Sequence, residues 1–142
     1  METEDQKKVR ERNDRYIVSN GLISCMSNAK WKAFFGDLIT RKIPGPVASL
    51  KEVRSPTIYG PSRKNWNEIV GYKYIEWIKI HPREEIARGR LAKSMRVDST
   101  DLYISWLESI HVPFEYGGDV ITIFGYRRLS SLDGVLSGAR RQ

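Results

Sequence analysis

The sequence of 142 residues predicts an α+β fold: a two-layer single domain in which an antiparallel sheet carries helices packed on one face. Three observations point to this fold. Apolar residues recur at helical spacing in one segment before Pro44 and in another after Asp101. Aromatic and β-branched residues are concentrated between Tyr72 and Ile80, as in a strand. A Gly117-Gly118-Asp119 turn separates two short apolar runs, which is the pattern of a hairpin.

The first 26 residues are predicted to form a charged N-terminal arm, helical from Asp5 to Tyr16. They carry five basic and five acidic side chains, which cancel. A helix is predicted next, from Ser27 to Ile39, because its apolar residues fall on one face. Ser27 or Asn28 is a suitable N-cap, and Pro44 lies where a helix cannot continue. The residues of the apolar face are Trp31, Phe34, Phe35, Leu38 and Ile39.

The middle of the chain is predicted to supply most of the sheet. Residues 47–60 fit one or two short strands interrupted by Pro56, and a loop is expected from Gly60 to Asn67. A strand from Tyr72 to Ile80 follows, and His81-Pro82 ends it.

Arg83 to Arg96 is predicted to be a helix weakened by Gly89, with a basic stripe along one side. Capping residues 98–101 then open another helix, whose apolar face runs from Leu102 to Ile110. Residues 112–116 and 120–126 are predicted to pair as a hairpin. The predicted domain therefore covers residues 27–129, and residues 130–142 form a basic tail rich in Ser and Gly.

The net charge of +7 lies in the predicted domain and the tail, which favours encounter with nucleic acid, anionic lipid or an acidic protein. No run of apolar residues is long enough to span a bilayer, so no membrane association is expected. The N-terminus lacks the apolar core of a secretory signal. Cys25 is the single cysteine of the sequence, which fits a reducing, cytoplasmic location.

Four short pieces, in this order, resemble a small uncharacterised bacterial domain family without an assigned function. They are Asn28-Ala29-Lys30-Trp31, Ile75-Glu76-Trp77-Ile78, Ile110-His111-Val112-Pro113 and Ile123-Phe124-Gly125-Tyr126-Arg127. The likeness covers about residues 28–127 and excludes both ends of the chain. It implies a bacterial or phage origin and one compact domain, and it supplies no catalytic residues. By analogy with similar orphan domains, it implies an immunity or antidote role in a toxin locus.

The residue patterns of common enzymes and metal sites are absent from the sequence. Two histidines and one cysteine, far apart in the chain, give no metal-ligand spacing. No nucleophile elbow or phosphate-binding loop is present. We therefore predict no enzyme, no cofactor, no metal and no small-molecule substrate. His81, His111 and Glu76 would revive an enzymatic hypothesis if they converged on one pocket.

The sequence therefore favours a protein-binding module, most concretely an immunity or antidote protein that occupies a cognate toxin. Because the chain is basic, an acidic partner is expected. The predicted partner-binding residues are Tyr59, Arg63, Lys64, Trp66, Tyr72 and Glu76.

The alternative is a nucleic-acid-binding accessory protein that uses a basic helix face and exposed aromatic residues. Stacking is expected from Trp66, Tyr72 and Tyr74. The predicted phosphate contacts are Arg83, Arg90, Lys93 and Arg96.

Overall fold

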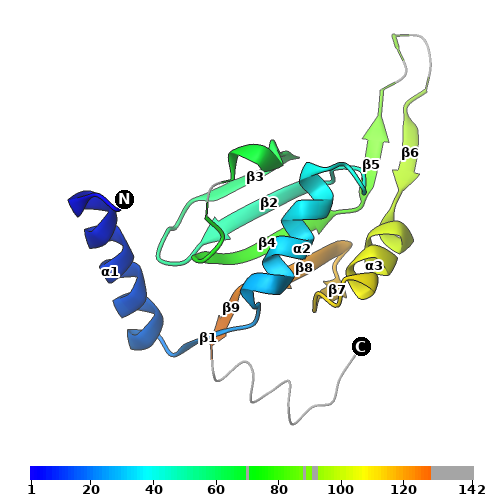
Figure 1. Ribbon diagram of the computed structural model, residues 1–142. Coiled ribbons are helices and arrows are strands. Elements are labelled where there is room, and N and C mark those ends of the chain that lie inside the picture. The colour runs from blue at the N-terminus through cyan, green and yellow to red at the C-terminus, as the bar shows by residue number, and fades with distance from the viewer. Residues whose placement is uncertain (70, 88, 91–92, 129–142) are drawn as a thin grey trace.

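The computed structural model describes residues 1–69, 71–87, 89–90 and 93–128 (Figure 1). Its helices are α1 (Glu4–Ser19), α2 (Asn28–Ile39) and α3 (Thr100–Ser109), with a short 3₁₀ helix η1 (Trp66–Glu68). Its strands are β1 (Leu22–Ser24), β2 (Val47–Glu52), β3 (Ile58–Arg63), β4 (Ile75–His81), β5 (Arg83–Ile86), β6 (Met95–Asp98), β7 (Glu115–Gly117), β8 (Val120–Phe124) and β9 (Tyr126–Arg128).

The main sheet has five strands in the order β3-β2-β4-β8-β7, and every neighbouring pair is antiparallel. Helices α2 and α3 lie over one face of this sheet (Figure 1). Two smaller antiparallel pairs, β1–β9 and β5–β6, complete the fold. The predicted α+β class, with an antiparallel sheet and helices on one face, is confirmed.

The two helices on the sheet form where the sequence predicts them. The hydroxyl of Ser27 accepts a hydrogen bond from the Lys30 amide and so caps α2. At the start of α3, the Asp98 carboxylate accepts hydrogen bonds from the amide and the hydroxyl of Thr100. Each helix thus satisfies part of its first turn with a local side chain.

The core lies between these helices and the sheet. Alternate residues of β4 and β8 point toward the helices, and Ile78, Ile80, Ile121 and Ile123 are all 0% exposed. Phe34 of α2 is also fully buried and stacks on Trp106 of α3, with 5.3 Å between ring centroids. This aromatic stack joins the two helices above the sheet.

The predicted helix from Arg83 to Arg96 is wrong. Its described residues form the hairpin β5–β6, which projects from the body of the molecule (Figure 1). Gly89 adopts a φ of 108°, a left-handed conformation that no α-helix contains. The strands on either side of Gly89 pair antiparallel, with Ile86 opposite Met95 and Glu85 opposite Arg96. The predicted basic helix face is therefore a strand pair.

Several predicted boundaries also differ. The expected loop from Gly60 to Asn67 begins as part of β3, where Pro61 is accommodated because β3 is an edge strand. The strand predicted from Tyr72 begins at Ile75. The predicted second arm of the final hairpin is divided at Gly125 into β8 and β9, and β9 pairs with β1.

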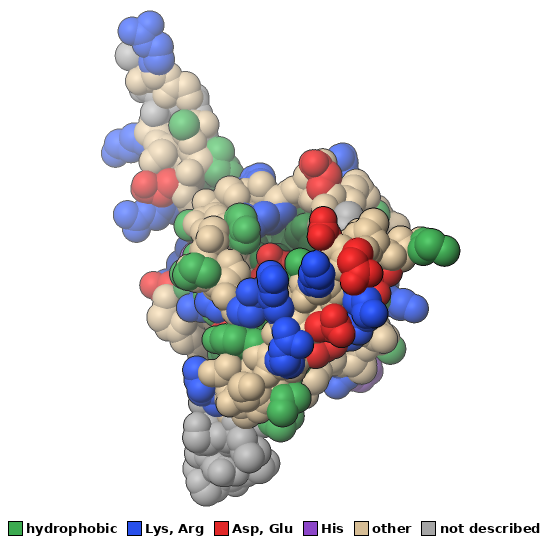
Figure 2. Space-filling model, turned by 90° about the vertical axis from the view of Figure 1, so that its left-hand side faces the viewer, with side chains coloured by type: hydrophobic (Ala, Val, Ile, Leu, Met, Phe, Trp, Pro, Cys, Tyr) green, Lys and Arg blue, Asp and Glu red, His purple; other side chains and the backbone are tan. Residues whose placement is uncertain are grey.

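The helix predicted within the N-terminal arm is longer than expected and spans Glu4–Ser19. Its C-terminal half contacts the body through two side-chain hydrogen bonds. Arg54 donates to Asn13 over 2.9 Å, and the Tyr74 hydroxyl donates to Asp14 over 2.8 Å. Asn13 is buried. The interleaved basic and acidic side chains on the side of the molecule that carries α1 are seen in Figure 2.

Candidate binding surfaces

Three of the predicted partner-binding residues lie on or just after β3. Tyr59 is 49% exposed on this edge strand, beside Ile58, which is 54% exposed. Arg63, at the end of β3, donates to the Gly45 carbonyl and pairs with Glu84 over 2.5 Å. Lys64 follows Arg63 and donates to the Tyr59 carbonyl. All six residues of β3 are exposed, so this edge is open to a partner.

A shallow depression lies beside the end of β3. It encloses about 410 Å³ and is lined by Leu38, Ile39, Arg41, Arg63, Lys64, Asn65, Trp66 and Asn67. Its lining holds three cationic side chains and no acidic one. Partial burial lowers the pKa of the Lys64 ammonium. The depression adds positive charge to this end of the sheet.

Two other predicted contact residues belong to the core packing. Trp66 is 6% exposed and packs against Phe34, with ring centroids 6.1 Å apart. Its buried indole N–H has no hydrogen-bond partner among the described groups. Tyr72 is half-buried and stacks on Phe35 at 5.8 Å. Trp66 therefore offers little surface to a partner, and Tyr72 presents only part of its ring.

Glu76 lies at a β-bulge in β4. The register shifts so that Lys51 of β2 pairs with Trp77, and Glu52 pairs with Ile75. Glu76 is the extra residue, and its carboxylate binds the Lys51 ammonium over 2.6 Å. The bulge places Glu76 and Trp77 together on the sheet face opposite α2 and α3. The six predicted contact residues therefore do not form one surface.

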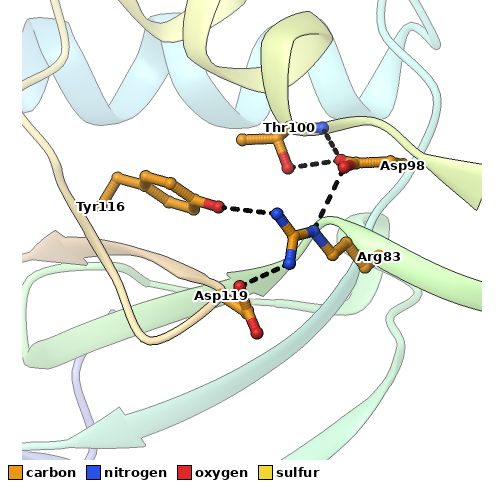
Figure 3. Close-up of polar contacts among 5 residues, drawn as sticks. All are labelled: Arg83, Asp98, Thr100, Tyr116 and Asp119. Atoms are coloured by element: carbon orange, nitrogen blue, oxygen red, sulfur yellow. Dashed lines mark hydrogen bonds and ion pairs between the residues drawn. The ribbon is translucent and has the colours of Figure 1, made fainter.

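Arg83, predicted to contact phosphate, is held by two carboxylates (Figure 3). Its guanidinium lies 3.1 Å from Asp98 and 2.6 Å from Asp119, and one Nη lies 3.5 Å from the Tyr116 hydroxyl. Hydrogen bonds from Thr100 lower the pKa of Asp98, and the charge of Arg83 lowers it further. Asp119 lies in the β7–β8 turn. Arg83 therefore connects the base of the hairpin to the body.

The remaining predicted phosphate contacts, Arg90, Lys93 and Arg96, belong to the distal hairpin and are exposed. Arg96 lies 3.5 Å from Glu85, and both side chains are largely exposed. In the sequence, residues 86–96 contain four basic and no acidic residues. Figure 2 shows Lys and Arg side chains along this projecting arm and at its end. By sequence, this segment therefore has a net positive charge.

The sheet face opposite α2 and α3, which we call the open face, carries aromatic and basic side chains. Trp77 of β4 pairs directly with Phe124 of β8, and both are half-buried. The Lys79 ammonium lies 4.5 Å from the Trp77 ring centroid. The Arg127 guanidinium lies 4.1 Å from the Phe124 ring centroid, and it pairs with Glu115 over 2.6 Å. Each of the two rings thus makes a cation–π contact with a basic side chain.

Sequence reasoning missed the open face. It assigned exposed stacking to Trp66, Tyr72 and Tyr74, but Trp66 is core and the Tyr74 hydroxyl is bound to Asp14. The useful signal was the alternation of Trp77 and Lys79 with the buried Ile78 and Ile80. The bulge at Glu76 interrupts that alternation, so the outward residues are not evident along the whole strand.

The hypothetical catalytic groups lie apart in the structure. Ser49 Oγ and His81 Nε2 are 2.8 Å apart, and Ser49 is 4% exposed. Burial lowers the pKa of His81, and the charges of Lys79 and Lys64 lower it further. Glu76 is bound to Lys51, and His111 follows the end of α3. No group of three metal-ligating side chains occurs in the part of the chain that the structure describes.

The fold and these surfaces define a small α+β domain with an exposed edge strand, a basic hairpin arm and an aromatic open face. The chain belongs to a family of unknown function (DUF6678), whose model matches residues 13–130. Membership of an uncharacterised domain family, indicated by the four sequence pieces, is thus confirmed. The match begins at Asn13, the α1 residue bound by Arg54.

No curated protein and no solved structure matches the chain. Among the described helices, none has the length and apolar character needed to cross a membrane.

Proposed function

We propose that this protein is a non-enzymatic protein-binding module of the immunity or antidote type, which occupies a cognate toxin or effector and blocks it. The observation that carries the proposal is the fully exposed edge strand β3. Ile58 and Tyr59 place large apolar side chains there, next to Arg63 and Lys64. Apolar and aromatic groups beside arginine are typical of the centre of a protein interface.

The edge geometry indicates how a partner would dock. An edge strand offers unpaired backbone groups to an added strand, but Pro61 removes one amide donor from β3. The partner is therefore expected to pair with only part of the strand, and it would contact Tyr59 on the helix side of the sheet and Ile58 on the opposite side. The positive charge of Arg63, Lys64 and the neighbouring depression favours an acidic surface on the partner.

The test is affinity capture from the native cell lysate after nuclease treatment, with three tagged proteins. Wild type is expected to retain one cognate protein, and Tyr59→Asp is expected to lose it. Leu102→Asp serves as the matched control, because Leu102 is similarly exposed, at 45%, but lies on α3. Equal capture by all three proteins, or no specific capture by wild type, would overturn the proposal.

Nucleic-acid binding is a second candidate function, supported by the acid-free basic segment 86–96 of the hairpin arm. A two-stranded β-ribbon fits a DNA major groove, and basic side chains on it neutralise phosphates. The affinity is then expected to fall steeply between about 50 and 200 mM salt. The double variant Arg90→Gln, Arg96→Gln should lower the affinity and flatten the salt slope. Unchanged binding by this variant would show that the hairpin does not bind nucleic acid.

A further inference from the structure

The open face has a composition that a merely solvated sheet face does not require. Such faces commonly alternate polar residues outward. Here the central strand β4 and its neighbour β8 each place an aromatic ring outward, with Trp77 directly opposite Phe124. Trp77 is half-buried, whereas Trp31, Trp66 and Trp106 are at most 6% exposed.

Cations surround this aromatic pair. Lys51 lies in register with Trp77 on one side, and Lys79 and Arg127 lie over the two rings. The acidic side chains among the described residues of this face, Glu76 and Glu115, are paired with Lys51 and Arg127. The face therefore keeps a positive excess at Lys79, directly beside the Trp77 ring.

We propose that the open face binds single-stranded nucleic acid, with unpaired bases stacking on Trp77 and Phe124 and phosphates contacting Lys79, Lys51 and Arg127. This inference deepens the second candidate function by naming the ligand class and a separate site, and it rests on that function. Alternating aromatic and cationic groups match the alternating bases and phosphates of a single strand. A duplex keeps its bases stacked and cannot offer them to the rings.

The sheet spacing suits this ligand. Neighbouring strands lie about 4.8 Å apart, so the rings of Trp77 and Phe124 stand side by side. Two neighbouring splayed bases of one chain can then each meet one ring. A base approaching Trp77 brings its phosphate near Lys79, which can exchange its ring contact for a charge-assisted one. Because stacking is tolerant of base identity, weak sequence preference is expected.

Intrinsic tryptophan fluorescence provides a direct test with the full chain. Oligo(dT) and oligo(U) of about 15 nucleotides are the probes, and a duplex of equal length is the comparison. Both single strands should quench the emission of wild type, because base stacking reaches Trp77. The affinity, measured by anisotropy of labelled oligonucleotides, should fall about tenfold or more in Trp77→Leu and in Phe124→Leu.

Tyr116→Leu is the matched control. Tyr116 is exposed, but it pairs with Ile121, whose side chain faces the core, so its ring lies on the other side of the sheet. This variant should bind the single strands as wild type does. Lys79→Gln removes a charge without removing a ring, and it should weaken binding while preserving the quenching at saturation.

The outcomes separate this inference from the function on which it rests. If single strands bind without quenching, and Trp77→Leu and Phe124→Leu bind as wild type, the open-face site is overturned. If, in addition, Arg90→Gln, Arg96→Gln abolishes binding, nucleic-acid binding survives through the hairpin alone. If neither single strands nor duplex bind, both the inference and the candidate function fail.

Discussion

At the scale of single residues, two glycines of this chain have opposite surroundings. A Cβ on Gly125 would lie 2.0 Å from the Ile75 carbonyl oxygen, closer than any contact the backbone can accept. Gly125 also donates to the Glu76 carbonyl over 2.7 Å, next to the bulge. Gly36 in the middle of α2 has no such neighbour, since a Cβ there would meet nothing within 4 Å.

We therefore expect Gly125→Ala and Gly36→Ala to change stability in opposite directions. Gly125→Ala must push the β4 and β8 backbones apart and should lower the free energy of unfolding by about 2 kcal/mol or more. Gly36→Ala should raise it by about 0.5–1 kcal/mol, because alanine loses less backbone entropy in a helix. Urea denaturation of both variants checks the prediction, and a stable Gly125→Ala protein would contradict it.

A third residue-scale constraint concerns His81. Folding lowers its pKa, first through burial and then through Lys79 and Lys64. As the pH falls below the ordinary histidine value of about 6.5, the unfolded chain takes up the proton first. The contribution of His81 to stability is therefore complete above that pH and is lost as the pH falls toward the lower folded-state pKa.

The measurement is a pair of urea midpoints at about pH 7.5 and pH 5, for wild type and His81→Gln. Wild type should lose more stability than the variant on acidification, because glutamine has no proton to gain. Other groups titrate in both proteins, so only the difference between the two reports on His81. Parallel losses would show that His81 titrates alike in the folded and unfolded chains.

At the scale of elements, the hairpin β5–β6 shows why the sequence was misleading. Helices α2 and α3 were predictable because each carries its own apolar periodicity and capping residues. The hairpin has no such local stripe, and Ala87, Leu91 and Met95 imitate a helical spacing over a short stretch. Its conformation depends on the pairing of β5 with β6 and on the ion pair between Arg83 and the distant Asp119. Sequence spacing reveals neither of these contacts.

This dependence leads to a prediction for the hairpin as a unit. Arg83→Gln removes the ion pair with Asp98 inside the hairpin and the ion pair with Asp119 that joins the hairpin to the β7–β8 turn. Amide hydrogen exchange in β5 and β6 should then accelerate by roughly two- to fivefold, as expected for exposed pairs, while β4 and β8 keep their protection. Arg96→Gln is the control, since its pair with Glu85 is longer and more exposed. Equal exchange in both variants would mean that Arg83 does not anchor the arm.

The candidate contact residues were less predictable than the fold, because the exposure of a side chain depends on how the elements pack against one another. A side chain becomes accessible only after helices and sheet are stacked, and this stacking buries Trp66 while leaving Tyr59 exposed. Both residues are aromatic and lie in the same stretch of sequence. Only the packing of η1 against α2 distinguishes them.

At the scale of the whole molecule, the attachment of α1 decides where the folded unit begins. Among the described residues, two side-chain hydrogen bonds join α1 to the body, from Arg54 to Asn13 and from Tyr74 to Asp14, and both lie in the second half of α1. Burial raises the pKa of the Tyr74 hydroxyl, and the hydrogen bond to Asp14 raises it further. The family match also begins at Asn13. The first half of α1, by contrast, carries local contacts such as the pair Glu2–Arg10.

Two truncations test this division. A chain that starts at Asn13 should keep a melting temperature close to that of wild type, because it retains both links. A chain that starts at Gly21 loses both and should be about 2 kcal/mol less stable, at roughly 1 kcal/mol for each hydrogen bond, which lowers the melting temperature by several degrees. Tyr74→Phe in the full chain should reproduce about half of that loss, because it removes one link and keeps the helix. If the chain starting at Gly21 has the same melting temperature as wild type, α1 does not contribute to the stability of the domain, and the folded unit begins at β1.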